Sequence, residues 1–100
     1  MSQPKIKALS SKAPDEVVPV IFEFGGLVTA IDSVVSLSVT VHKGTDPDPS
    51  TMILNASSVD GTDVTQLIQG GLDTVIYKVR ALVQSGQLRY ALEAHLPVRY

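Results

Sequence analysis

The stretch "DTVIYKVRALV", residues 73–83, decides the fold class of this chain. Its odd-numbered residues after the first are all apolar or aromatic and share one face: Val75, Tyr77, Val79, Ala81 and Val83. The other face carries Lys78 and Arg80. This alternation predicts a β-strand with one face in a core and one face in contact with water.

The next stretch, residues 88–98, alternates in the same way and predicts a partner strand. A two-residue loop at Ser85 and Gly86 would close a hairpin in which Val79 faces Leu92, so that the two apolar faces coincide. The same register sets Lys78 opposite Glu93, which is a favourable cross-strand pair. A loop with one more residue would set apolar side chains against polar ones, so the pattern selects an even-length loop.

The spacing around Tyr77 narrows the fold further. Asp73 lies four residues before this tyrosine, and Val79 stands two residues after it, where an immunoglobulin-type domain would have a cysteine. This is the spacing of a tyrosine corner, in which the hydroxyl is a structural group. We therefore predict an all-β, immunoglobulin-like β-sandwich with an extended N-terminal arm.

The remaining segments are consistent with short strands separated by turns. Residues 16–24 and 35–42 alternate, and the second of these stretches has a clear apolar face made of Val35, Leu37, Val39 and Val41. The two prolines of "GTDPDPS", residues 44–50, predict a loop, followed by a short strand at 52–54. Residues 63–70 fit either a strand or a short helix capped by Asp63, and their β-branched residues favour the strand.

The length predicts one domain, because 100 residues support a single core. Residues 1–15 are rich in serine, proline, lysine and alanine and are interpreted either as an N-terminal arm with an edge strand at residues 5 to 9 or as a frayed terminus. Residues 16–100 form the predicted β-sandwich domain.

Composition excludes several classes of function. The net charge of −2 offers no attraction for nucleic acid or for an anionic membrane surface, so neither is an expected partner. The absence of cysteine excludes disulfides and thiol chemistry and fits folding in the cytoplasm. We expect no signal peptide and no membrane-spanning segment, since the chain has no apolar run of about 18 residues.

Residues that could carry chemistry are few. His42 and His95 occur without any hydrolase, protease or nucleotide-binding motif, and we interpret both as surface residues. Asp46 and Asp48 lack the spacing of a calcium loop. We therefore expect no enzyme activity, no catalytic residue, no metal, no cofactor and no small-molecule substrate.

Three basic residues, Lys78, Arg80 and Arg89, fall close together on the outer face of the predicted hairpin. No aromatic side chain is interleaved with them, as a nucleic-acid surface would require. We expect a solvated or protein-binding face.

Four motifs in a fixed order, "DPDPSTMI", "DVTQLIQGG", "IYKVRALVQSGQ" and "LPV", resemble a family of small virion proteins of tailed bacteriophages. The resemblance covers residues 44–98. The matching positions are Asp46, Pro47, Pro49, Val64, Gln66, Ile68, Gly70, Gly71, Tyr77, Gly86, Leu96, Pro97 and Val98. Asn55 and Thr74 depart from the pattern, which favours a glycine or another small residue there.

The resemblance implies a non-enzymatic structural protein of the virus particle. Our first hypothesis is a capsid decoration or cement protein, a minor capsid protein that binds the major capsid protein on the virion surface as a homo-oligomer. A phage tail or fibre component is the alternative, and an immunoglobulin-like surface binding module is a further one. The expected partner-binding residues lie in the arm and in the proline-rich loop: Lys5, Ile6, Lys7, Leu9, Thr45, Asp46, Pro47, Asp48 and Pro49.

Overall fold

The computed structural model describes residues 5–7 and 11–100 of the chain. Its elements are seven β-strands and one turn of 3₁₀-helix. In chain order they are β1 (Lys5–Lys7), β2 (Val18–Glu23), β3 (Ser33–Lys43), η1 (Pro49–Met52), β4 (Ile53–Asp60), β5 (Asp63–Ile68), β6 (Ile76–Ser85) and β7 (Leu88–Pro97). Among these residues, no helix has the length and apolar content needed to cross a bilayer.

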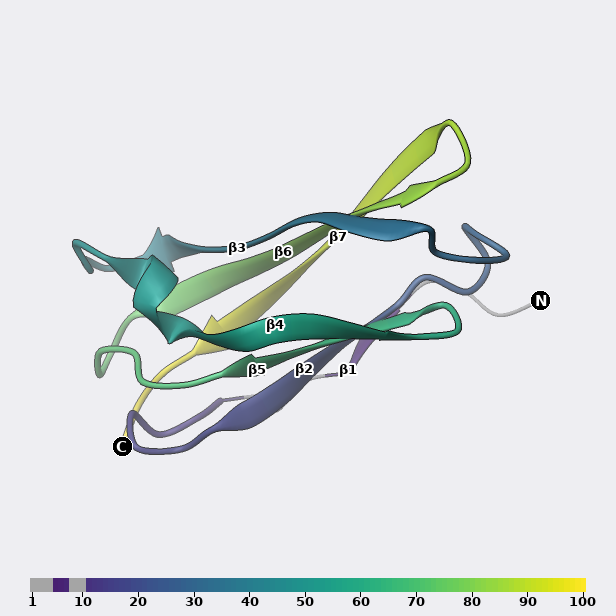
Figure 1. Cartoon of the computed structure of the whole chain (residues 1–100). Helices are drawn as coiled ribbons and strands as arrows, with labels where there is room; N and C mark the ends of the chain where they lie inside the picture. Colours follow the sequence, from purple (N-terminus) through teal and green to yellow (C-terminus); the bar gives the residue numbers. More distant parts are fainter. Residues whose placement is uncertain (1–4, 8–10) are drawn as a thin grey trace.

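The strands form two antiparallel sheets that pack face to face (Figure 1). One sheet has the order β1-β2-β5-β4 and the other has the order β3-β6-β7. Lettered A to G along the chain, these are sheets ABED and CFG, which is the arrangement of a constant-type immunoglobulin domain. The prediction of an all-β sandwich is confirmed.

The core lies between the two sheets and consists of the residues that the alternation assigned to the inner faces. Phe22, Val79 and Tyr77 are fully buried at its centre. Leu37 and Leu92 are half-buried and pack against it. Burial of such side chains contributes roughly 1.5–3 kcal/mol each, so this layer dominates the stability of the fold.

The β6-β7 hairpin forms with a different loop from the one predicted. Ser85 pairs with Leu88, so Gly86 and Gln87 make the turn, and Val79 pairs with Ala94 instead of Leu92. Gly86 has φ 62°, which fits the first position of a type II′ turn, where glycine is required. The register differs from the prediction by two residues, so the apolar faces still coincide.

The outer face of this hairpin also keeps its charge pairing after the change of register. Glu93 lies opposite Arg80, with Nε and Oε1 3.5 Å apart, and its other oxygen is 3.9 Å from the Lys78 ammonium. The predicted pair of Lys78 and Glu93 is therefore a diagonal contact instead of a directly opposed one.

The short strand predicted at 52–54 is instead an eight-residue strand, Ile53–Asp60, and a bulge causes a further departure in β3. Val34 pairs with Val83 and Ser36 with Leu82, so Val35 is an extra residue in β3 and its side chain is exposed. The prediction that Val35 belongs to the core face was wrong, because a bulge shifts the alternation by one residue. Val34 packs against the core instead.

A further irregularity lies in β4 between Leu54 and Ser58. Asn55 has φ 63° there, and Thr74, in the loop before β6, has φ 72°. Both positions lie in the left-handed region that glycine adopts without strain, which is the physical reason for the glycine or small residue in the phage pattern. Residues 63–68 form a strand, as favoured from the sequence.

The described part of residues 1–15 is attached to both sheets. β1 pairs with β2, with Lys5 opposite Glu23 and Lys7 opposite Ile21. Lys12 forms a parallel bridge with Val98, just after β7. Leu9, which we expected to contact a partner, lies outside the described residues.

Candidate functional site

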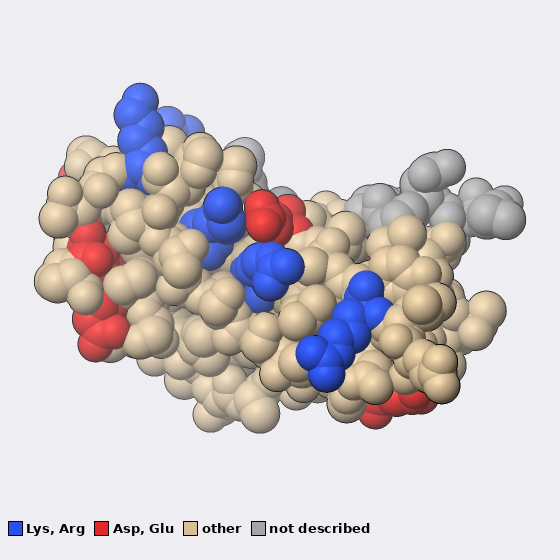
Figure 2. Space-filling model, turned by 90° about the horizontal axis from the view of Figure 1, so that it is seen from above, with Lys and Arg blue, Asp and Glu red and all other residues tan. Residues whose placement is uncertain are grey.

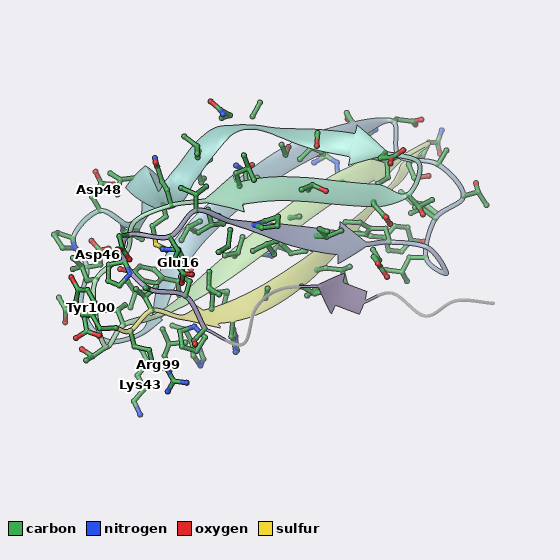
Figure 3. All side chains as sticks on the ribbon, turned by 90° about the horizontal axis from the view of Figure 1, so that it is seen from below. Glu16, Lys43, Asp46, Asp48, Arg99 and Tyr100 are labelled. Carbon is green, nitrogen blue, oxygen red and sulfur yellow. The ribbon has the colours of Figure 1, made fainter. Side chains whose placement is uncertain are left out.

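Four segments meet at one end of the sandwich, which we call the loop end. They are residues 11–17 before β2, residues 44–50 between β3 and β4, residues 69–75 between β5 and β6, and residues 98–100 after β7. Figure 3 shows side chains from these segments gathered at this end, together with Lys43 at the end of β3. The labelled side chains are Glu16, Lys43, Asp46, Asp48, Arg99 and Tyr100.

The phenol of Tyr77 connects two of these segments. Its hydroxyl accepts a hydrogen bond from the backbone N–H of Leu72 at 2.9 Å, which is the tyrosine-corner contact predicted from the spacing. The same hydroxyl donates to Asp46 Oδ2 at 2.6 Å. Burial and this bond to Asp46 raise the pKa of Tyr77 to about 12, so the phenol stays protonated at neutral pH.

The proline-rich loop is held in shape by its own acids. Asp46 Oδ1 accepts a hydrogen bond from the backbone N–H of Asp48 at 2.9 Å, and Asp48 Oδ1 accepts one from the Ser50 hydroxyl at 2.6 Å. Such short contacts from aspartate to nearby groups are typical of turns. With Asp46 also bound to Tyr77, the loop is held by hydrogen bonds within the chain.

A buried lysine, Lys12, connects two segments of the loop end. The Lys12 ammonium donates to the carbonyl oxygens of Gly70 at 2.5 Å and Ala13 at 2.7 Å, and the residue is 1% exposed. Burial lowers the pKa of Lys12, while the nearby carboxylates of Glu16 and Asp15 oppose this effect. Lys12 therefore links residues 11–17 to the loop before β6.

The chain after β7 is held on both sides. The Lys12 N–H donates to Pro97 O at 3.0 Å, and the Arg99 N–H donates to Lys12 O at 2.9 Å. On the other side, Thr74 N–H donates to Val98 O at 2.8 Å. These hydrogen bonds fix the direction in which the chain runs from Val98 to Tyr100.

Exposed apolar groups accompany the charges of the loop end. Tyr100 is 89% exposed and Leu72 is 47% exposed, and Val17 is exposed as well. Tyrosine and arginine are enriched at the energetically dominant positions of protein interfaces, and here Arg99 stands next to Tyr100. The loop end therefore combines exposed apolar and charged side chains on an ordered scaffold.

Comparison with known protein families gives a match to a model described as the podophage GP4 fiber-tail adaptor protein gp77, over residues 12–97. The chain belongs to this family. The matched span includes β2 to β7 and most of the loop end. The comparisons with curated proteins and with solved structures found no match.

Membership of the adaptor family makes this chain a phage virion structural protein, as the sequence resemblance implied. The family is named for a component between fibre and tail. It therefore supports the tail alternative better than capsid decoration, which was our first hypothesis.

The structure separates the residues that we expected to bind a partner. Residues 45–49 lie at the loop end, whereas Lys5, Ile6 and Lys7 pair with the far end of β2, near Glu23 (Figure 1). Sequence reasoning missed Lys12. The residues around Lys12 are mostly small or polar, and apolar residues do not recur among them at the spacing of a strand or a helix. No pattern in the sequence therefore indicates that Lys12 is buried.

The outer face of the β3-β6-β7 sheet carries the predicted basic residues. Figure 2 views the molecule from this side and shows Lys and Arg side chains spread over the face, with acidic groups beside some of them. His42 and His95 are exposed on this face and stack with ring centroids 4.1 Å apart. Within the described residues, no group of three or more His, Asp or Glu side chains is placed to hold a metal ion.

Proposed function

We propose that this chain is a non-enzymatic tail component that joins a fibre to the tail of a podophage and that it uses the loop end as one docking surface. The observation that carries the proposal is the match to the fiber-tail adaptor family over residues 12–97. An adaptor needs a fixed surface for a partner and has no need of a reactive group.

The geometry of the loop end supports this role. Ordering a loop during binding costs about 0.5–1.5 kcal/mol for each immobilised side chain. Asp46 is already bound to Tyr77 and to the backbone of Asp48, so residues 45–49 avoid part of that cost. Tyr100 and Leu72 then supply exposed apolar area beside the ordered loop.

The arm contributes to docking in a more limited way than we expected from the sequence. Lys5, Ile6 and Lys7 already use one side of their backbone to pair with β2. Any strand that a partner adds to β1 would use the opposite side of its backbone. In this proposal the loop end is the main docking surface, and β1 lies at the other end of the sheet.

The test is co-sedimentation of purified protein with three kinds of particle that lack it: complete tails without fibres, isolated fibres and DNA-free heads. We expect binding to tails and to fibres. Binding to heads alone would contradict the tail assignment and support capsid decoration.

Two alanine substitutions test whether the loop end is the docking surface. Leu72→Ala and Tyr100→Ala should each weaken binding by about tenfold or more, as expected for central interface residues. Val35→Ala removes an exposed side chain of comparable character in the β3 bulge and should leave binding unchanged. Equal losses in all three variants would remove the loop end from the docking surface.

A further inference from the structure

The four edge strands of the sandwich differ in how well a further strand could pair with them. β1 has three residues, β4 is interrupted between Leu54 and Ser58, and β3 has two register shifts. Short or bulged edges of this kind prevent pairing between molecules. β7 is different, because it runs from Leu88 to Pro97 against β6 with no shift.

The hydrogen bonds after β7 show which of its backbone groups face the open side. Pro97 O and Arg99 N–H bond to Lys12, which lies outside the sheet, whereas Val98 N–H bonds to Val75 O on the β6 side. Backbone groups alternate along an antiparallel strand, so the N–H and C=O of Arg89, Ala91 and Glu93 also face away from β6. No described residue pairs with this part of the edge.

The side chains on the same stretch are symmetric about Ala91. In "LRYALEA", residues 88–94, Arg89 and Glu93 are equidistant from this alanine and have opposite charges. Tyr90 and Leu92 flank it directly, and Leu88 and Ala94 form the outermost apolar pair. A second copy of the strand, turned by 180°, would therefore meet complementary groups at every position.

We propose that β7 pairs antiparallel with β7 of a second copy of this chain, with Ala91 on the two-fold axis. Arg89 of each copy then lies opposite Glu93 of the other, and the two β3-β6-β7 sheets join into one continuous sheet. This is an isologous contact made by strand addition at a sheet edge. It does not depend on the adaptor function proposed above.

Charge selects this register among the alternatives. Moving the axis by one residue to Leu92 would pair Arg89 with His95 and lose both ion pairs. Moving it to Glu93 would oppose two like charges, which is destabilising. With the axis at Ala91, Arg89, which is exposed and has no ion-pair partner among the described residues, lies opposite Glu93 of the other copy. Glu93 then shares its carboxylate between this arginine and its own Arg80 and Lys78.

Exposure supports the same contact. Leu88 is 59% exposed at the hairpin tip, which rises away from the other sheet in Figure 1. Pairing would bring it against Ala94 of the second copy and cover part of its surface. Lys12 already occupies the edge beyond Pro97 and β1 lies close to β7, and none of the described residues forms a backbone pair with the stretch centred on Ala91.

The first test is the molar mass of the full chain in solution, by sedimentation equilibrium over a concentration series. We expect a dimer of twice 10.7 kDa. Arg89→Glu should raise the dissociation constant by tenfold or more, since it opposes two carboxylates across the axis. Lys43→Glu changes the net charge equally but lies away from the β7 edge, and it should have no effect.

Combining Arg89→Glu with Glu93→Arg restores the opposite charges and should recover much of the dimer. Ala91→Pro removes an N–H that faces the open edge without touching the β6 ladder, so it should abolish the dimer while the thermal transition persists. Thermal unfolding of each variant confirms that the fold is intact.

The register has its own test, because the chain contains no cysteine. Ala91→Cys would place two thiols on the axis about 5.5 Å apart between Cα atoms, within disulfide reach. In Gln87→Cys the two thiols would be roughly 26 Å apart along the strands. We expect oxidation to cross-link the first variant and leave the second monomeric in denaturing gels.

A wild-type chain that stays monomeric at about millimolar concentration would overturn the proposal. So would a dimer that survives both Ala91→Pro and Arg89→Glu, or faster cross-linking at position 87 than at position 91. Each of these three outcomes leaves the adaptor assignment untouched, because that assignment is tested by binding to tails and fibres.

Discussion

The hydroxyl of Tyr77 donates a 2.6 Å hydrogen bond to Asp46 Oδ2, across a sequence separation of 31 residues. This single contact ties the start of β6 to the proline-rich loop after β3. Because the same hydroxyl accepts from Leu72 N–H, removing it breaks two bonds of the loop end at once.

Tyr77→Phe should therefore destabilise the fold by about 1–3 kcal/mol, because it leaves the partly buried Leu72 N–H and the Asp46 Oδ2 atom without their shared partner. Chemical denaturation of the variant and the wild type measures this difference. A double-mutant cycle with Asp46→Ala should give a coupling of at least about 0.5 kcal/mol. Additive effects of the two changes would show that the contact contributes nothing.

Stability should fall in the alkaline range because of the same phenol. An unfolded tyrosine ionises near pH 10, whereas the pKa of Tyr77 in the fold is about 12. The unfolded state therefore loses its proton first, so stability is full below pH 10 and falls as pH rises towards 12. At about 1.4 kcal/mol per pKa unit, the loss approaches roughly 3 kcal/mol.

Lys12 has the opposite effect on how stability depends on pH. Its pKa is lowered in the fold, so as pH rises the folded state loses this proton before the unfolded state does, and stability increases. Comparing wild type with Tyr77→Phe cancels this contribution, because both proteins keep Lys12. The stability difference between them should shrink from pH 10 to 12. A difference that stays constant over this range would contradict the assigned shift.

Gln66 should tolerate no negative charge. Its side-chain nitrogen is buried and lies 3.0–3.1 Å from the carbonyl oxygens of Leu54, Asn55 and Leu67, at the β4 irregularity. Gln66→Glu replaces this donor with an oxygen facing other oxygens, so we expect a loss of about 3 kcal/mol or more. Thermal unfolding measures it.

Gln69→Glu is the matched control, because Gln69 makes an exposed contact with Thr51 O at 3.3 Å. Its effect should stay within about 0.5 kcal/mol. Equal effects at positions 66 and 69 would mean that the buried amide is not specifically needed at the β4 irregularity.

The adjacent glycines Gly70 and Gly71 should differ in their response to alanine. Both have positive φ, 64° and 95°, so each substitution carries a backbone cost of about 1 kcal/mol. A Cβ at position 71 would lie 2.9 Å from Val98 Cγ2 and 3.1 Å from Met52 Cε, whereas position 70 has open space. Gly71→Ala should therefore cost at least about 1 kcal/mol more in denaturant unfolding, and equal costs would contradict this close packing.

The sequence by itself determined the strands and their faces. In β6 and β7 the alternation is local, because neighbouring side chains point to opposite sides of the sheet whatever the rest of the chain does. Tyr77 was recognisable as a corner residue for a similar reason, since its bond to Leu72 spans only five residues. The order of the phage motifs pointed to a virion protein, and the family match agrees.

The tertiary structure alone decided where the alternation breaks and which polar groups meet. The turn at Gly86 and Gln87 selects one of several registers that differ by two residues and satisfy the alternating pattern equally well. The bulge at Val35 shifts the alternation by one residue, which the pattern does not indicate. Lys12 is buried because Gly70, 58 residues away, presents a carbonyl oxygen to it. Asp46 binds Tyr77 in the same way, and such pairs depend on how two sheets pack, which no local pattern in the chain records.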